Sequence, residues 1–227
     1  MNRRKLVRDQ SPGHSLPGRQ IALPKPTAGR STSVFAALKK RKTDRFISAR
    51  ELPLQMLSNL LWSACGINRK NGPFGIPGST AASASNSREI DLYVALKEGT
   101  YRYEPVPHGL TLVVAQDLRA AAIGKGQGGA GARAPVRLVY VVDIDKFSKA
   151  GFQEPGLEDP EIQKSYYFVD TGLIAGNVYL FAASHGLATW FHNCSKAELS
   201  AKLSLTRYQR VLFGQTVGYA ETAKRSS

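Results

Sequence analysis

The stretch VRLVYVV, residues 136–142, is the most strand-like segment of the chain. Six of its seven residues are apolar, and four are valines, whose β-branched side chains favour an extended backbone. The apolar residues follow one another without the alternation of a half-exposed strand, which is typical of a strand covered on both faces. We therefore expect residues 136–142 to form the central strand of a sheet.

Further strands are indicated at residues 91–96, 100–103, 111–114 and 210–217. The first two are separated by Lys97-Glu98-Gly99, which suits a hairpin turn. Because the strands cluster instead of alternating regularly with helices, we expect an α+β fold with a mixed, mainly antiparallel central sheet flanked by helices. A doubly wound parallel fold is disfavoured for the same reason.

Helices are indicated by apolar side chains at spacings of three and four. Residues 54–64 show this periodicity and end at Gly66. Residues 171–185 are apolar nearly all round, which requires burial on all sides. Shorter helices are expected at residues 34–38, 117–123 and 196–203.

Three segments are expected to be irregular. Residues 69–87, RKNGPFGIPGSTAASASNS, consist mostly of turn formers and small residues, and long loops in compact domains are often functional. Residues 124–135, GKGQGGAGARAP, are expected to be a mobile connection. Residues 144–164 are polar and contain prolines, which suggests a lid or an excursion from the fold.

The net charge of +14 is concentrated near the N-terminus. Residues 1–45 hold twelve Lys and Arg against two acids, which leaves +4 for the rest of the chain. Residues 1–30 lack apolar periodicity and are expected to be a flexible basic arm, with residues 31–227 as the folded domain. This concentration of positive charge leaves one alternative function open, that of a nucleic-acid-binding module using residues 1–45. However, no Phe, Tyr or Trp precedes Phe35 to stack on a base, so only nonspecific contact with nucleic acid is expected.

Composition and motifs disfavour several other classes of protein. The two cysteines are far apart and form no CxxC pair, which favours reduced thiols in a cytoplasmic protein over a disulfide framework or a metal site. No apolar segment typical of a secretory signal follows the basic start, and the least polar window, residues 166–184, contains Asp170 and two glycines, which disfavours a membrane span. No HExxH, GxSxG or Walker-type motif occurs. Such a chain is expected to take its reactivity from a cofactor.

Residues 39–46 read KKRKTDRF, and within them Arg41-Lys42-Thr43-Asp44-Arg45 resembles the nitroreductase-family signature of Arg, a basic or polar residue, Ser or Thr, any residue, and Arg or Lys. Three later segments also resemble that family, in the same order: STAASASNS before the strand EIDLYVAL, DTGLIAGNVYLFAASHGLATW, and VLFGQTVGYA. The resemblance implies a nitroreductase-like fold, FMN as cofactor, and a homodimer with the apolar helix at its interface.

The chemistry of residues 41–45 fits such a cofactor on its own terms. Arg41 and Thr43 offer a guanidinium fork and a hydroxyl to a phosphate and a ribityl chain. Arg45 can bring positive charge beside the part of the flavin ring that becomes negative on reduction. The resemblance implies these roles, with Lys42 in the same binding segment. The alternative for this run of cations is a solvated helix end.

By resemblance, three further segments are implied to contact the flavin: the small-residue loop, the segment after the long helix, and the basic C-terminus. The matching residues are Ser83, Ala84, Asn86, His192, Asn193, Lys224 and Arg225. Asn86 can both donate and accept hydrogen bonds. Without the resemblance, these positions are turn residues, a half-exposed surface histidine and a frayed tail.

The resemblance therefore implies an FMN-dependent oxidoreductase. It would take hydride from NADH or NADPH, and the sequence does not distinguish the two. It would then reduce nitroaromatics, quinones or similar electron-poor small molecules in a ping-pong cycle, with no catalytic side chain required. Flavin-dependent dehydrogenases that oxidise azolines in modified peptides are the alternative within the same fold.

Overall fold

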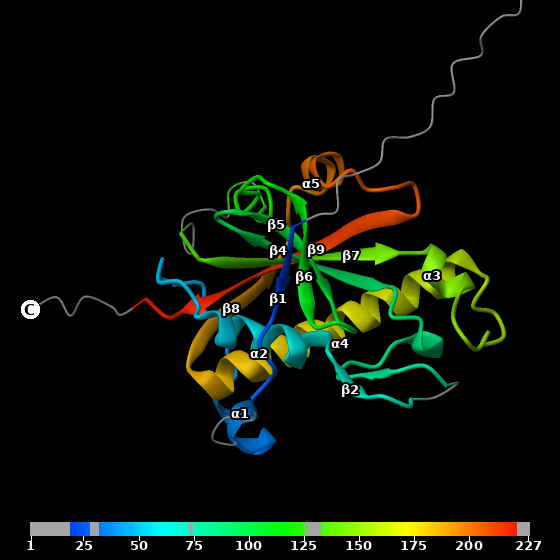
Figure 1. Cartoon of the computed structure of the whole chain (residues 1–227), viewed down its shortest axis with the longest axis horizontal. Coiled ribbons are helices and arrows are strands. Elements are labelled where there is room, and N and C mark those ends of the chain that lie inside the picture. The colour runs from blue at the N-terminus through cyan, green and yellow to red at the C-terminus, as the bar shows by residue number, and fades with distance from the viewer. Residues whose placement is uncertain (1–18, 28–31, 73–74, 125, 127–132, 222–227) are drawn as a thin grey trace, which may run out of the picture.

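A seven-stranded sheet forms the centre of the molecule (Figure 1). The computed structural model describes residues 19–27, 32–72, 75–124, 126 and 133–221. The order of the strands is β1-β6-β5-β4-β7-β9-β8, and the pairings between these described strands are all antiparallel. The strands are β1 (Gln20–Ala22), β4 (Ile90–Leu96), β5 (Gly99–Glu104), β6 (Gly109–Val114), β7 (Val136–Asp143), β8 (Leu187–His192) and β9 (Gln209–Tyr219). The α+β class and the mainly antiparallel sheet are confirmed.

Strand β7 lies inside the sheet with both faces covered, as its continuous apolar sequence predicts. Leu138 and Tyr140 pack into the large core on the face that carries α2 (Leu54–Cys65) and α4 (Pro160–His185). Val139 and Val141 belong to a second core on the other face.

Helices flank the sheet on both sides (Figure 1). Helices α1 (Val34–Lys40), α2 and α4 lie on one side, and α5 (Lys196–Lys202) covers the opposite face through Leu199. Helix α1 begins at the cap Ser33, whose Oγ accepts a hydrogen bond from the Ala36 N–H at 3.2 Å. The predicted helices at 34–38, 54–64 and 196–203 are confirmed within a few residues.

Helix α4 begins earlier than the sequence analysis expects. Asp159 caps its N-terminus by accepting a hydrogen bond from the Glu161 N–H at 2.8 Å, and Pro160 occupies the first turn. The expectation of an excursion at residues 144–164 is therefore wrong for residues 160–164, which form the first turn of α4. The same stretch also contains the short helix α3 (Asp145–Ser148).

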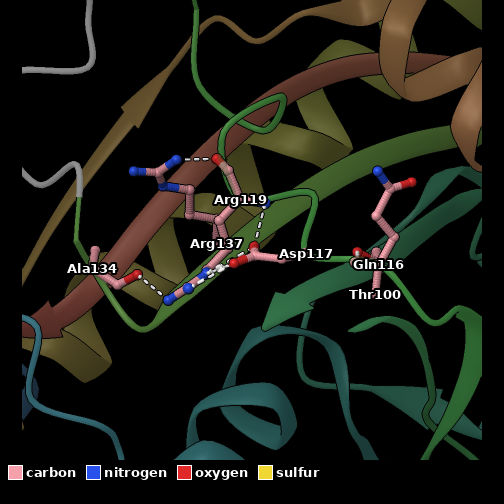
Figure 2. A network of polar contacts seen from close by, with 6 residues as sticks. All are labelled: Thr100, Gln116, Asp117, Arg119, Ala134 and Arg137. Carbon is pink, nitrogen blue, oxygen red and sulfur yellow. Dashed lines mark hydrogen bonds and ion pairs between the residues drawn. The ribbon is translucent and has the colours of Figure 1, made fainter. Parts of the chain in front are cut away.

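The helix expected at residues 117–123 does not form, because side chains hold this segment as turns (Figure 2). Asp117 accepts hydrogen bonds from both the backbone and the guanidinium of Arg119, and Arg119 also donates to the Ala134 carbonyl at 3.2 Å. From β7, the guanidinium of Arg137 donates to the Arg119 carbonyl, and Arg137 is 1% exposed. Local side-chain bonds of this kind compete with the helical backbone pattern.

Other segments expected to lack regular structure contain short strands. Residues 20–22 form β1 against β6, and Thr27 exchanges two hydrogen bonds with Asn59 of α2, so the expectation of a flexible arm over residues 1–30 is wrong for residues 19–27. Residues 1–18 and 28–31 lie outside the described residues. The loop 69–87 includes β3 (Gly78–Ser79), which pairs with β2 (Ile67–Arg69). Most of the predicted mobile connection at 124–135 also lies outside the described residues.

Candidate functional site

The predicted phosphate-binding segment lies along the outer edge of the sheet. Directly after α1, the Asp44 N–H donates to the Thr189 carbonyl of β8 at 3.0 Å, and the Ser48 N–H donates to the Tyr219 carbonyl of β9 at 2.9 Å. Ile47 forms an isolated bridge with Ala220. The backbone of residues 44–48 is thus fixed against β8 and the end of β9, while the side chains of Arg41, Thr43 and Arg45 are exposed.

Two aromatic residues organise these side chains. The Arg41 guanidinium lies over the Tyr179 ring of α4 at 5.5 Å, and the Arg45 guanidinium lies over the Trp190 ring of β8 at 5.3 Å. Thr43 Oγ1 is 3.2 Å from the Tyr179 hydroxyl, which also accepts a hydrogen bond from the Phe191 N–H at 2.9 Å. Arg41 and Thr43 therefore meet at Tyr179 of α4, and Arg45 lies over Trp190 of β8; we call these five residues the platform. The sequence analysis did not single out Tyr179 or Trp190 for this role.

The charges of this platform are unbalanced. Within the described residues, neither Arg41 nor Arg45 forms an ion pair, whereas Lys42 pairs with Asp44 at 3.0 Å. The Trp190 Nε1–H is buried and has no hydrogen-bond partner there. The exposed guanidinium groups of Arg41 and Arg45 and the Thr43 hydroxyl are donors that suit an anionic, oxygen-rich ligand.

The small-residue loop forms a strained turn. Ser85, Asn86 and Arg88 have φ angles of 50°, 54° and 48°. Left-handed backbone costs non-glycine residues about 1 to 2 kcal/mol each, and such strain concentrates at functional sites. The Ser83 Oγ accepts a hydrogen bond from the Arg88 N–H at 3.0 Å, and Asn86 Nδ2 donates to the Pro77 carbonyl at 3.3 Å. The Ser85 hydroxyl is buried without a partner among the described residues, so it is available to a ligand.

Two buried carboxyl groups lie behind this loop, and the sequence analysis did not identify them. Glu89 is 0% exposed and Asp170 of α4 is 4% exposed. Asp170 Oδ2 accepts a hydrogen bond from the Ala84 N–H at 3.0 Å, and Glu89 Oε2 accepts one from Ser87 Oγ at 2.7 Å. Burial, followed by the proximity of Asp170, raises the pKa of Glu89 to about 8, and burial also raises the pKa of Asp170.

A cavity of about 280 Å³ lies beside this carboxyl pair. Ser83, Ser87, Arg88, Glu89 and Asp170 contribute to its wall. On another side of it, the Lys146 ammonium forms an ion pair with Asp91 at 2.6 Å.

The platform and the loop do not meet within one chain. Both contact α4, the platform through Tyr179 and the loop through Asp170. Nine residues separate these positions, which corresponds to about 14 Å along a helix. The cavities beside the loop contain no residue of the segment 41–45.

The side chain of His192 is not the half-exposed surface histidine of the alternative interpretation. It lies on β8, is 5% exposed, and uses both ring nitrogens, Nε2 with Thr216 Oγ1 and Nδ1 with the Asn193 carbonyl, each at 2.8 Å. Burial lowers the pKa of His192 to about 4. Both ring nitrogens are therefore engaged inside the protein, and the flavin contact implied for residues 192–193 stays a prediction. Lys224 and Arg225 lie outside the described residues.

Comparisons with known proteins agree with this fold. The model of the Nitroreductase family matches residues 38–219. A Methanocaldococcus jannaschii protein, MJ1384, which is provisionally named a nitroreductase, is 27% identical over 160 residues, covering 66% of this chain and 73% of that protein. Among the described helices, none combines the length and the apolar composition of a membrane span.

Solved structures give the same assignment. A provisionally named nitroreductase from Ralstonia eutropha JMP134 superposes with a TM-score of 0.79 at 32% identity, covering 96% of this chain and 97% of its own. An FMN-dependent nitroreductase from Clostridium difficile R20291 shares the fold at 16% identity, with a TM-score of 0.53 and coverage of 84% and 89%. The chain therefore belongs to the nitroreductase family.

Proposed function

We propose that this protein is an FMN-dependent oxidoreductase that takes hydride from NADH or NADPH and reduces electron-poor small molecules such as nitroaromatics or quinones by a ping-pong cycle. The observation that carries the proposal is the platform of Arg41, Thr43 and Arg45, whose two guanidinium groups have no carboxylate partner among the described residues. A phosphate dianion is the complementary ligand for such a set.

The residues present fit FMN, and each predicted segment has a definite task. Arg41 and Thr43 would hold the phosphate and ribityl oxygens, and Arg45 would keep positive charge beside the ring. The strained loop, with the buried Ser85 hydroxyl lacking a partner in the described structure, would contact the ring with Ser83, Ala84 and Asn86. The remaining proposed contacts are Lys42, His192, Asn193, Lys224 and Arg225. When bound, FMN supplies the two-electron redox chemistry, and the protein supplies binding, orientation and electrostatics.

A homodimer is part of the proposal, because the platform and the loop are separate in one chain. Apolar side chains are exposed on α1 and α4: Phe35 is 73% exposed, Val169 58% and Leu173 44%. Large apolar side chains exposed on two neighbouring helices suit an interaction surface. Pairing of two chains through α4 would allow the loop of one chain to complete the platform of its partner. Both cysteines are buried and unpaired, which suits the reduced thiols of a cytoplasmic protein.

The test is flavin binding and reduction. We expect the purified protein to bind FMN, to show flavin absorption, and to bleach anaerobically on addition of NADH or NADPH. Arg45→Ala is expected to weaken FMN binding and to lower the flavin reduction potential, because a positive charge near the reduced ring is lost. Lys39→Ala is the matched control, since Lys39 stacks on Phe35 of its own helix and does not contact the platform.

Two outcomes would contradict the proposal. A wild-type protein that cannot be loaded with FMN would exclude the cofactor, and equal FMN affinity in Arg45→Ala and Lys39→Ala would exclude Arg45 from the site. A loaded enzyme that oxidises azoline-containing peptides, and does not reduce nitroaromatics or quinones, would favour the dehydrogenase alternative.

A further inference from the structure

The cavity of about 280 Å³ beside the loop is lined by two carboxyl groups that each have an oxygen without a partner. Glu89 is 0% exposed, and its Oε1 forms no hydrogen bond within the described residues, although its Oε2 accepts one from Ser87 Oγ at 2.7 Å. Asp91 Oδ2 is also buried without a partner among these residues. Buried acceptors are destabilising when they lack a donor, so we expect a donor inside the cavity.

The wall of this cavity has more acidic than basic groups. The acids are Glu89, Asp91, Glu104 and Asp170, and the bases are Arg88 and Lys146. The Lys146 ammonium pairs with Asp91 at 2.6 Å, and Glu104 pairs with Arg102 at 2.8 Å. Glu89 and Asp170 have no cationic partner among the described residues, and the half-exposed Arg88 side chain is screened by water. Because buried carboxylates require a compensating charge, a positively charged ligand is favoured.

The rest of the wall is apolar, which indicates an organic cation. Leu92, Tyr103 and Ile174 line the cavity and are buried. No group of three or more His, Cys, Asp or Glu in the described part of the chain could hold a metal ion. The cavity reaches solvent at the turn between β5 and β6, because Val106 lines it and is 65% exposed. Its volume of about 280 Å³ corresponds to roughly nine water molecules, which suits a short alkyl chain with one charged group.

We propose that this cavity binds a small organic cation, an alkylammonium or alkylguanidinium compound, whose N–H groups donate to Glu89 Oε1 and Asp91 Oδ2. The alkyl chain would pack against the apolar part of the wall. Hydrogen bonds from a cation to a carboxylate are shorter and stronger than those between neutral groups. The inference goes beyond the proposed function, since it requires neither FMN nor a second chain.

Two other occupants can satisfy the same oxygens. Water fills polar cavities of this size, and a proton on Glu89 would remove its charge. Neither of them gives binding of an added cation that saturates and depends on the charge of the ligand. A titration that compares charged and uncharged ligands of one shape therefore separates the three cases.

Calorimetric titration with butylguanidinium and butylammonium tests the proposal, with butylurea as the uncharged analogue of butylguanidinium. The titrations are made at pH 9, because burial raises the pKa of Glu89 to about 8 and both cations stay charged at that pH. We expect saturable binding of the cations, with a dissociation constant for the tighter one at least tenfold below that of butylurea. Absence of cation binding, or equal affinity for butylurea, would show that water or a proton alone satisfies the carboxyl groups and would overturn the proposal.

Two substitutions place the bound cation at the two oxygens. Glu89→Gln and Asp91→Asn each remove one negative charge from the wall and preserve its shape, so each is expected to raise the dissociation constant for butylguanidinium at least tenfold. Glu98→Gln is the matched control, because Glu98 is exposed and lines a different cavity. It changes the net charge equally and is expected to bind like the wild type. Equal affinity of all three variants would overturn the proposal.

Cys65 provides a measurement in the wild-type chain that does not depend on the folding of a variant. Cys65 lines the acidic cavity and Cys194 lines a separate one, and both thiols are buried and unpaired. We expect saturating butylguanidinium to slow the modification of Cys65 by methyl methanethiosulfonate at least fivefold in mass spectrometry, with no change at Cys194. An unchanged rate at Cys65 would place the cation elsewhere and overturn the proposal.

The result for this cavity can be separated from the result for the cofactor. The titrations use the protein as purified, with any flavin that it carries, and FMN loading is measured on the same preparation. Cation binding with protection of Cys65 in a protein that cannot be loaded with FMN would support this inference and contradict the proposed function. FMN loading without cation binding would support the proposed function and overturn this inference.

Discussion

Glu89→Gln is expected to change how the stability of the protein depends on pH. Glu89 has a folded-state pKa of about 8 against a usual value of 4.5, so the folded chain binds this proton more tightly than the unfolded chain. The stabilisation is complete below pH 4.5 and is lost as the pH rises through 8. At about 1.4 kcal/mol for each pH unit, the interval amounts to at most about 5 kcal/mol, a large share of the 5 to 15 kcal/mol typical of a folded domain.

His192 makes stability depend on pH in the opposite direction, so its contribution has to be separated from that of Glu89. Its pKa falls from 6.5 to about 4 on folding, so its contribution is present above pH 6.5 and is lost as the pH falls through 4. Because His192 is the same in both proteins, it cancels in the difference between the wild type and Glu89→Gln. Only the carboxyl pair contributes to that difference.

The assay is urea unfolding followed by circular dichroism at pH 5, 6, 7, 8 and 9. We expect the free energy of unfolding of Glu89→Gln, relative to the wild type, to rise by several kcal/mol between pH 5 and pH 9, because glutamine keeps the hydrogen bonds without the titration. Parallel stability profiles for the two proteins would show that folding does not raise the pKa of Glu89, and would refute the reasoning.

Three other substitutions test separate parts of the structure. Tyr179→Phe removes the acceptor of the Phe191 N–H and is expected to cost about 1 to 2 kcal/mol in urea unfolding and to weaken FMN binding; unchanged values would exclude the platform network. Gly214→Ala would place a Cβ 2.5 Å from the Ala122 carbonyl oxygen, and is expected to lower stability by about 1 to 3 kcal/mol, measured in the same way. Leu173→Glu on the exposed face of α4 is expected to give a folded monomer in light scattering, and a persistent dimer would contradict the proposed interface.

The elements that could be predicted from the sequence are those whose signal is local. The continuous apolar run 136–142 predicts β7, and the apolar spacing with Gly66 predicts α2, because the apolar pattern that indicates each element lies within its own segment. Strand β8 was missed although LATWFH is rich in aromatic and apolar residues, since it follows α4 after only the left-handed Gly186. The start of α4 was missed because its first turns are polar, but Asp159-Pro160 is a cap signal that could have found it.

The candidate site likewise contains residues that the local sequence predicts and residues that it does not. The residues Arg41, Thr43 and Arg45 lie within five positions and carry a recognisable pattern, whereas the Thr43–Tyr179 contact spans 136 residues. Glu89 and Asp170 are far apart in the sequence, and neither has a local feature that indicates a buried acid pair. Such long-range contacts depend on tertiary packing, so composition and spacing do not reveal them.

Helix α4 relates the two parts of the candidate site to each other. It contacts the platform at Tyr179 and the loop at Asp170, and a helix keeps the spacing of about 14 Å between such positions fixed. Any adjustment of the site to acceptors of different size must therefore come from the loop or from the packing of two chains. Asp170 fastens the loop to this rigid helix by accepting a hydrogen bond from the Ala84 N–H, so any movement of the loop at Ala84 has to break that buried contact.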